Sequence, residues 1–172
     1  MSEPFLDGLT LGEGGEDIEL QSSEQNRVAA TQMVSQARRT LHIFSHDIEP
    51  QIYDNDEFVS AVKELVIYSR FTTVQILFRD PTYAIKHGHR LVDLFRRLSS
   101  SIELREIHSD FHTLNEAFLV VDGRGVIHRQ LASRYEGTAN FNAPMRGREL
   151  IHTFTQVWEK SQPHPELRRL HL

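Results

Sequence analysis

The sequence contains no cysteine and no long apolar run, and each absence excludes a class of function. Without cysteine there is no disulfide, no cysteine-ligated zinc, no iron–sulfur cluster and no thiol nucleophile. The longest uninterrupted apolar run, Ala117 to Val121, is far shorter than the ~20 residues that a membrane-spanning helix needs. The N-terminus has neither a basic start nor an apolar stretch of signal-peptide length, so we expect a cytoplasmic protein without a membrane span.

Basic residues are missing from residues 1–21, which carry six acidic side chains. The whole chain has 24 acidic and 19 basic residues, so the rest of the sequence is close to neutral. An acidic segment that also contains glycines buries too little apolar surface to order itself. We therefore predict a flexible acidic N-terminal arm over residues 1–21 and one domain over residues 22–172. The arm is a candidate to shield a basic face or to bind a protein partner.

Beyond the arm, helical and strand patterns alternate. Apolar residues at helical spacing predict helices over 23–39, from 54–56 to 68, over 89–98 and over 149–160. Apolar, β-branched and aromatic runs predict strands over 41–46, 73–78, 102–107, 115–121 and 125–131. The turn Asp122-Gly123-Arg124-Gly125 predicts that the last two strands form a hairpin. This order predicts an α/β sandwich with a mixed, largely parallel sheet flanked by helices.

Three segments carry a family resemblance. Residues 41–79 are predicted as strand, helix, strand; residues 115–123 read Asn-Glu-Ala-Phe-Leu-Val-Val-Asp-Gly; residues 137–141 read Gly-Thr-Ala-Asn-Phe. They resemble the opening of a phospholipase D-like half-domain, its catalytic strand (His-x-Lys-x-x-x-x-Asp-Gly in active members) and its Gly-Ser-x-Asn-Phe element. The chain is also similar to a group of small bacterial phospholipase D-like proteins. The resemblance implies the phospholipase D-like α/β fold.

At the catalytic positions of this family the sequence departs from the pattern. Alignment on Asp122 places Asn115 at the nucleophile position and Ala117 at the lysine position. In active relatives the histidine attacks phosphorus, and the lysine and an asparagine stabilise the phosphate oxygens. An amide cannot form a phosphoenzyme, and a methyl group carries no charge. We therefore predict a non-catalytic binding or assembly module, whose remnant pocket includes Asn115, Asp122, Thr138 and Asn140.

A displaced histidine is the first alternative. His46 follows a predicted strand, and ligands of α/β sheets gather at the carboxyl ends of strands. His46, Asp47, Arg79 and His128 are therefore candidates to line a crevice, and His46 or His128 could support an active phosphodiesterase or nuclease. A protein-interaction domain is the second alternative. No pair among the ten histidines has the spacing of a zinc motif, so we predict neither a metal nor a cofactor.

Partners follow partly from the resemblance. Active relatives with a single motif complete their site by homodimerisation, which implies a homodimer here. Nucleic acid or another phosphate-containing ligand is a candidate for the remnant pocket. The near-neutral domain and aromatic residues at core positions provide neither a basic footprint nor a base-stacking platform for nucleic acid.

Overall fold

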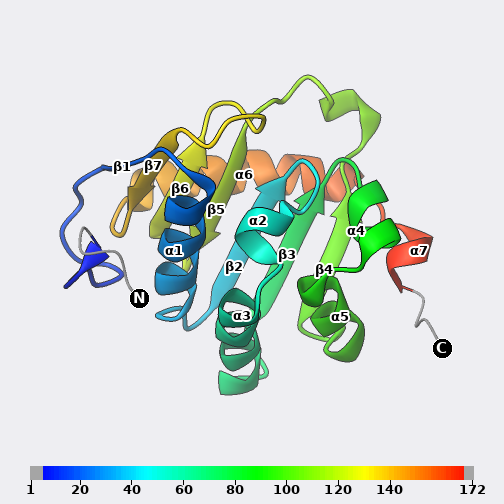
Figure 1. The fold of residues 1–172 in the computed structure, drawn as a ribbon, viewed down its shortest axis with the longest axis horizontal. Coiled ribbons are helices and arrows are strands. Elements are labelled where there is room, and N and C mark those ends of the chain that lie inside the picture. The colour runs from blue at the N-terminus through cyan, green and yellow to red at the C-terminus, as the bar shows by residue number, and fades with distance from the viewer. Residues whose placement is uncertain (1–5, 169–172) are drawn as a thin grey trace.

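The computed structural model describes residues 6–168 of the 172-residue chain. Figure 1 shows the helices and strands along the chain, with the same labels as here. The elements, in order, are β1 (Ile18–Leu20), α1 (Ser23–Val34), β2 (Thr40–Ser45), α2 (Pro50–Tyr53), α3 (Asp56–Tyr68), β3 (Thr73–Phe78), α4 (Thr82–His87), α5 (Arg90–Arg97), β4 (Ile102–Glu106), a 3₁₀ turn η2 (Ser109–Phe111), β5 (Ala117–Val121), β6 (Gly125–Arg129), β7 (Gly137–Asn140), α6 (Pro144–Lys160) and α7 (Pro165–Arg168).

Seven strands form one sheet in the order β1-β7-β6-β5-β2-β3-β4. β2 pairs with β3 and β3 with β4 in parallel, whereas the other four pairings are antiparallel. The α/β sandwich with a mixed sheet is confirmed, but the expectation of a largely parallel sheet is wrong. Parallel neighbours need a long crossover. Helices supply it between β2, β3 and β4, while a short turn joins β5 to β6.

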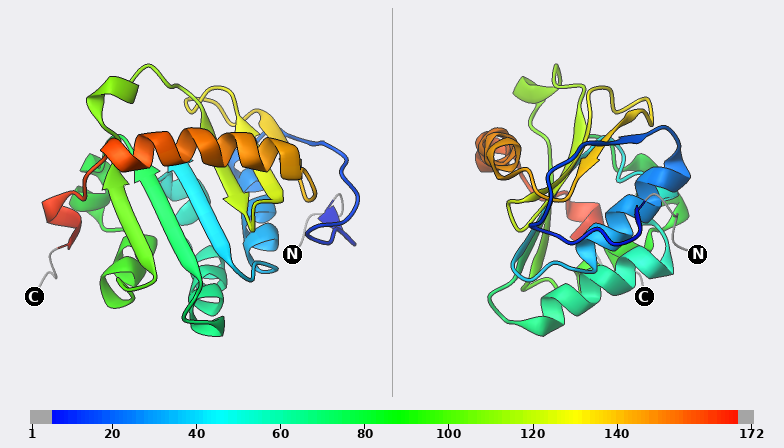
Figure 2. Two further views of the ribbon diagram at one scale, coloured as in Figure 1. Left: turned by 180° about the vertical axis from the view of Figure 1, so that it is seen from behind. Right: turned by 90° about the vertical axis from the view of Figure 1, so that its left-hand side faces the viewer.

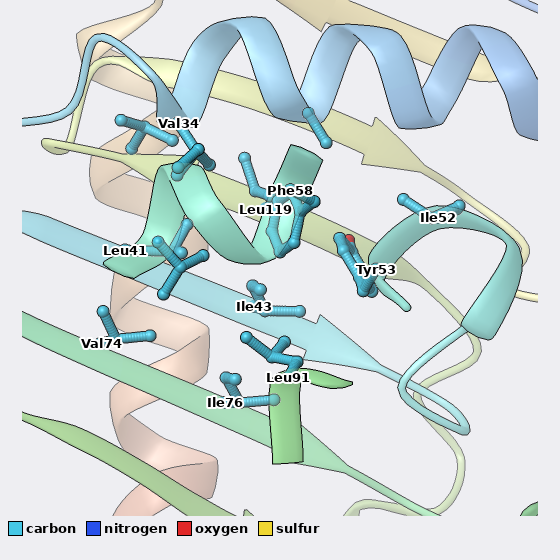
Figure 3. Close-up of a cluster of buried hydrophobic side chains, with 14 of the residues drawn as sticks. Val34, Leu41, Ile43, Ile52, Tyr53, Phe58, Val74, Ile76, Leu91 and Leu119 are labelled. Atoms are coloured by element: carbon cyan, nitrogen blue, oxygen red, sulfur yellow. The ribbon is translucent and has the colours of Figure 1, made fainter. Parts of the chain in front are cut away.

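Helices cover both faces of the sheet. Figure 2 shows α6 alone across one face, with α1, α3 and the other early helices on the opposite face. The larger core cluster lies on the α1 side and includes Phe58, Ile43 and Leu119, which are labelled in Figure 3. The second cluster packs α6 residues such as Phe154 and Trp158 against β2, β5 and β6. No helix in residues 6–168 is long and apolar enough to cross a membrane.

Local sequence signals explain where the helices start. The hydroxyl of Ser22 accepts the N–H of Gln25 at the start of α1, and the side chain of Asn55 accepts the N–H of Phe58 at the start of α3. Each bond satisfies a backbone donor that the first helical turn leaves free. α6 begins at Pro144, several residues before the predicted 149, because proline fits the first helical position, where no N–H is needed.

Residues 6–21 do not form the predicted flexible arm. Leu6 and Leu20 are fully buried, and β1 pairs with β7 at the edge of the sheet. The side chain of Gln36 on the α1–β2 connection accepts the N–H of Leu11 at 2.8 Å. The few apolar residues of this acidic segment thus pack into the core, and the edge of β7 supplies backbone partners. The predicted boundary at residue 21 lies just after β1.

Gly147 lets α6 approach the β5–β6 turn. A Cβ atom on this glycine would lie 2.3 Å from the carbonyl oxygen of Gly123. Alanine normally stabilises a helix interior relative to glycine. We expect Gly147→Ala to lower the free energy of unfolding instead, by about 1–3 kcal/mol, because the turn must shift. Urea unfolding measures this, with Arg148→Ala on an exposed position of the same helix as the control. A stabilised Gly147→Ala variant would contradict the packing described.

Candidate functional site

The side chain of Arg129 fills the space beside Ala117, which stands at the lysine position of the phospholipase D pattern. Ala117, the first residue of β5, is buried and lies directly opposite Arg129 of β6. Residues opposite each other in an antiparallel pair project from the same face. Both line a cavity of about 10 Å³ beneath α1, together with Asn26 and Tyr53. A space of that size holds about one water molecule and excludes a phosphate group.

The guanidinium of Arg129 is bound to the carboxylate of Glu49. The two side chains are only 3% and 8% exposed, and Arg129 Nη2 donates to Glu49 Oε1. Arg129 Nη2 also donates to the carbonyl of Ala132, and its guanidinium lies 5.7 Å from the centre of the Tyr135 ring. Burial raises the pKa of the Glu49 carboxyl, and the charge of Arg129 opposes that rise. An internal ion pair therefore occupies the side of the sheet on which a catalytic lysine would project.

A strained loop holds Glu49 in this position. The preceding residue, Ile48, has a φ of 60°, which is rare for a β-branched side chain. The N–H of Ile48 donates to the hydroxyl of Ser45, and its carbonyl lies 2.8 Å from Nε2 of the buried His89. His89 Nδ1 accepts the N–H of Leu91, so Nε2 carries the proton and donates to Ile48. Ser45 and His89 therefore fix the backbone of Ile48, and this loop in turn positions the Glu49 side chain for the ion pair.

On the other face of the sheet, His128 and Thr138 line a cleft of about 540 Å³. The two residues are opposite each other in the β6–β7 pair. His128 Nε2 lies 2.8 Å from Oε2 of Glu116, and both side chains are about one-quarter exposed. Residues of the β6–β7 connection, such as Gln130 and Leu131, and residues 19–21 of the N-terminal segment complete the lining. Of the six predicted pocket residues, these two are the ones that line one cavity.

Asn115 and His46 lie near this end of the sheet but do not line the cleft. Asn115 is exposed just before β5, and its carbonyl accepts the N–H of Ala132 at 2.6 Å. His46 is exposed at the carboxyl end of β2, where its carbonyl accepts the N–H groups of Arg79 and Asp80. The structure therefore fixes the backbone of both residues. Arg79 thus contacts His46 through the backbone, while the crevice of His46, Asp47, Arg79 and His128 stays a prediction.

Asp122 lies at the opposite end of β5 from Asn115. Its carboxylate accepts the backbone N–H groups of Arg38, Arg39 and Thr40 at 2.8–2.9 Å. Its φ of 53° is left-handed, which aspartate tolerates better than most residues. Asp122 thus fastens the α1–β2 connection to the β5–β6 turn, and the structure does not bring it to the His128 cleft.

Asn140 is bound by the N-terminal segment. The buried side chain donates from Nδ2 to the carbonyl of Gly15 and to Asp17 Oδ1, both at 2.9 Å. Arg146 of α6 also binds Asp17, at 3.2 and 3.4 Å. The bond from Asn140 is the main cause that lowers the pKa of the Asp17 carboxyl, followed by the bond from Arg146. The carboxylate of Asp17 therefore accepts the hydrogen bond of Asn140, the residue that the phospholipase D pattern associates with phosphate. Asn140 and Ala117 project from opposite faces, towards α6 and α1.

The ion pair of Glu49 and Arg129 is the feature that the sequence analysis missed. The alternation of β6 offered one signal, because Ile127 faces the core and Arg129, two residues further along, must face it too. Its partner lies 80 residues away in a loop and had no such signal. No group of three or more histidines, cysteines or carboxylates within residues 6–168 is arranged to hold a metal ion.

Comparison with known proteins places the chain in a family. The model of the domain of unknown function DUF7931 matches residues 22–170. The chain belongs to this family. No curated protein matches its sequence significantly.

Solved structures of phospholipase D family members share the fold. NucT from Helicobacter pylori superposes with a TM-score of 0.64 at 12% identity, over 88% of this chain and 100% of that chain. Nuc from Salmonella typhimurium, a phospholipase D family member, gives 0.58 at 15% identity, over 87% and 99%. TrmBL2, an archaeal chromatin protein that binds DNA, gives 0.61 at 15% identity, and the match covers 87% of this chain but 55% of TrmBL2. The DUF7931 chain therefore has a phospholipase D-like fold.

Two histidines, the half-buried His42 and the buried His89, make the stability of this DUF7931 domain depend on pH. Burial lowers the pKa of His42, which packs edge-on against Phe154, and also that of His89, below the usual 6.5. Below pH 6.5 these two histidines therefore bind more protons in the unfolded chain than in the folded chain, so their contribution to stability falls as the pH drops towards the lowered values. We expect a lower Tm at about pH 5 than at about pH 7.5.

The variant His42→Leu isolates one contribution to this pH dependence. It removes one of the two titrations, so the fall in Tm on acidification should become shallower than in the unmodified protein. His152→Leu, on an exposed position of α6, is the matched control and should leave the slope unchanged. Equal slopes for His42→Leu and the unmodified protein would show that His42 does not titrate differently on folding.

Proposed function

We propose that this chain is a non-catalytic phospholipase D-like domain that acts as a binding and assembly module. The observation that carries the proposal is the buried ion pair between Arg129 and Glu49, which lies beside Ala117 where the family's lysine would project. Asn115 cannot form a phosphohistidine, and the 10 Å³ cavity beside Ala117 cannot admit a phosphate group. The remaining polar residues then bind rather than react.

The cleft of His128 and Thr138 is the proposed ligand site. Its volume of about 540 Å³ lies in the range of small-molecule pockets, and its lining includes the cation of Arg134 as well as the carboxylates of Glu19 and Glu136. We propose a phosphate-containing ligand or nucleic acid as the occupant, with Asn115 and His46 at its margin. The DNA-binding chromatin protein TrmBL2, which shares the fold, supports nucleic acid as one candidate.

We also propose a homodimer in a bacterial cytoplasm. Support comes from the family resemblance, in which single-motif members pair, and from the bacterial origin of Nuc and NucT, which share the fold. Sedimentation equilibrium tests the assembly, and a monomer at micromolar concentration would contradict it. The acidic N-terminal segment is the candidate contact for a further protein partner.

The second candidate function is a phosphodiesterase that uses a displaced histidine. The contact between His128 and Glu116 favours it, because a carboxylate that holds one ring nitrogen fixes the orientation of the ring and leaves the other nitrogen free to face a substrate. His128 is the better candidate of the two histidines, since it lines the cleft and His46 does not. A DNA assay distinguishes the two functions, because a phosphodiesterase cleaves the DNA and a binding module leaves it intact.

Fluorescently labelled single-stranded DNA, with and without Mg²⁺ and at two salt concentrations, separates the functions. Binding that weakens with salt, without cleavage on a gel, is the expected result. Cleavage that is lost in His128→Ala but kept in the exposed control His152→Ala would overturn the proposal in favour of the displaced histidine. If DNA neither binds nor is cut, nucleic acid is excluded as the ligand, and a protein-interaction domain becomes the better description.

A further inference from the structure

Exposed apolar side chains gather at the end of the molecule opposite the His128 cleft. Ile67 and Tyr68 end α3, and Phe71 follows in the loop to β3. Their exposed fractions are 65%, 65% and 77%. Single exposed apolar residues are normal on a protein surface, but three within five positions form a patch that calls for a partner.

Arginine side chains frame these residues. The guanidinium of Arg38 lies 5.0 Å from the centre of the Tyr68 ring, and that of Arg70 lies 4.9 Å from the centre of the Phe71 ring. Arg39 is adjacent, because its carbonyl accepts the N–H of Thr73 at the start of β3. Arg38, Arg39 and Arg70 are all exposed. We call this surface the basic–aromatic end; it consists of Arg38, Arg39, Ile67, Tyr68, Arg70 and Phe71.

Little negative charge opposes these arginines. Glu64 is exposed one turn earlier on α3, next to Lys63, whose charge balances it. The carboxylate of Asp122 is engaged by three backbone N–H groups of the α1–β2 connection. The basic–aromatic end is therefore positive, although the whole chain has a formal net charge of −5.

The shape of this surface is convex. In Figure 1, α3 and its following loop extend beyond the end of the sheet. No residue of the basic–aromatic end lines any of the five main cavities in the described part of the chain. Apolar tips that project from a convex, positive surface suit a flat partner better than a strand that must lie in a groove.

We infer that the basic–aromatic end docks this protein on an anionic lipid surface. Phe71, Tyr68 and Ile67 would enter the headgroup and upper acyl region, where aromatic and aliphatic side chains are stabilised. The arginines would contact the phosphates of anionic lipids, and each basic residue near such a surface contributes to the affinity. The inference concerns a surface separate from the proposed ligand cleft and does not depend on it.

Two other occupants fit less well. A second copy of the chain in a two-fold contact would place Arg38, Arg39 and Arg70 near their own equivalents, with like charges opposed. Single-stranded nucleic acid is held in positive grooves with stacking aromatic rings. No residue of this end lines any of the five main cavities in the described part of the chain, and the aliphatic Ile67 offers no ring for a base.

Flotation with lipid vesicles tests the inference. The purified chain should bind vesicles that contain phosphatidylglycerol in phosphatidylcholine, more weakly at high salt, and should not bind phosphatidylcholine alone. Arg39→Ala should weaken binding about fivefold, and Phe71→Ser about tenfold. The controls Arg148→Ala and Met145→Ser change an exposed arginine and an exposed apolar residue at the start of α6, and should bind as the unmodified chain does.

Three results would overturn the inference. The first is no binding to anionic vesicles, and the second is binding that Arg39→Ala and Phe71→Ser leave unchanged. The third is that Arg39→Ala and Phe71→Ser weaken the binding of labelled single-stranded DNA, measured by anisotropy, while the unmodified chain binds no vesicles. That result would assign the surface to nucleic acid. Because both residues are exposed, urea unfolding should show that the variants remain folded. Failure of vesicle binding leaves the His128 cleft and its DNA assay unaffected.

Discussion

Replacement of Arg129 by leucine should lower the free energy of unfolding by about 3–5 kcal/mol, since it leaves a buried carboxylate without its partner. Glu49 is 8% exposed on its side chain and has one other polar side-chain contact, the hydroxyl of Ser45 at 3.3 Å. Without the guanidinium, Glu49 should take up a proton, and the loss of stability should be smaller in acid than at neutral pH. Urea unfolding at the two pH values measures both effects.

A double replacement distinguishes the ion pair from general packing. Glu49→Leu combined with Arg129→Leu removes both charges, so most of the stability lost in Arg129→Leu should return. Arg148→Leu, at an exposed position, is the control and should change stability by less than about 0.5 kcal/mol. If the double variant is as unstable as the sum of the two single variants, the buried pair is not the source of the effect.

Local sequence signals predicted most of the fold. The predicted strands 41–46 and 73–78 lie within one residue of β2 and β3, and the helix predicted to start at 54–56 starts at Asp56. These elements combine strong apolar patterns with a cap or a turn. β7 was missed because Gly-Thr-Ala-Asn carries no bulky strand-forming pattern. Its pairing depends on β6 and β1, and β1 itself lies in the segment expected to be an arm.

For the candidate site, the sequence predicts which residue types stand at the motif positions, but it does not predict which residues contact one another. The absence of histidine at Asn115 and of lysine at Ala117 is visible in the sequence. The contacts that define the site join distant residues: Arg129 meets Glu49 across 80 positions, and Asn140 meets Asp17 across 123. Neither partner belongs to a motif. A family pattern therefore indicates which groups are missing, while the structure shows which groups fill their space.

Restoration of the family's residues should not restore catalysis. The double variant Asn115→His with Ala117→Lys supplies both missing groups, but the introduced lysine would enter a buried position directly opposite Arg129. A second buried cation without a partner should lower the free energy of unfolding by about 3 kcal/mol or more. We expect no cleavage of labelled single-stranded DNA, and a Tm well below that of Asn115→His alone, since Asn115 is exposed.

The introduced lysine should be tolerated only when Arg129 is removed. In Ala117→Lys with Arg129→Ala, the new ammonium can pair with Glu49, so the double variant should be more stable than the sum of the two single losses. A matched variant, Ala117→Met with Arg129→Ala, adds similar length without charge and should show no such gain. Cleavage by the Asn115→His, Ala117→Lys variant at normal stability would mean that the ion pair does not close the site, and the non-catalytic assignment would then rest on the two substitutions alone.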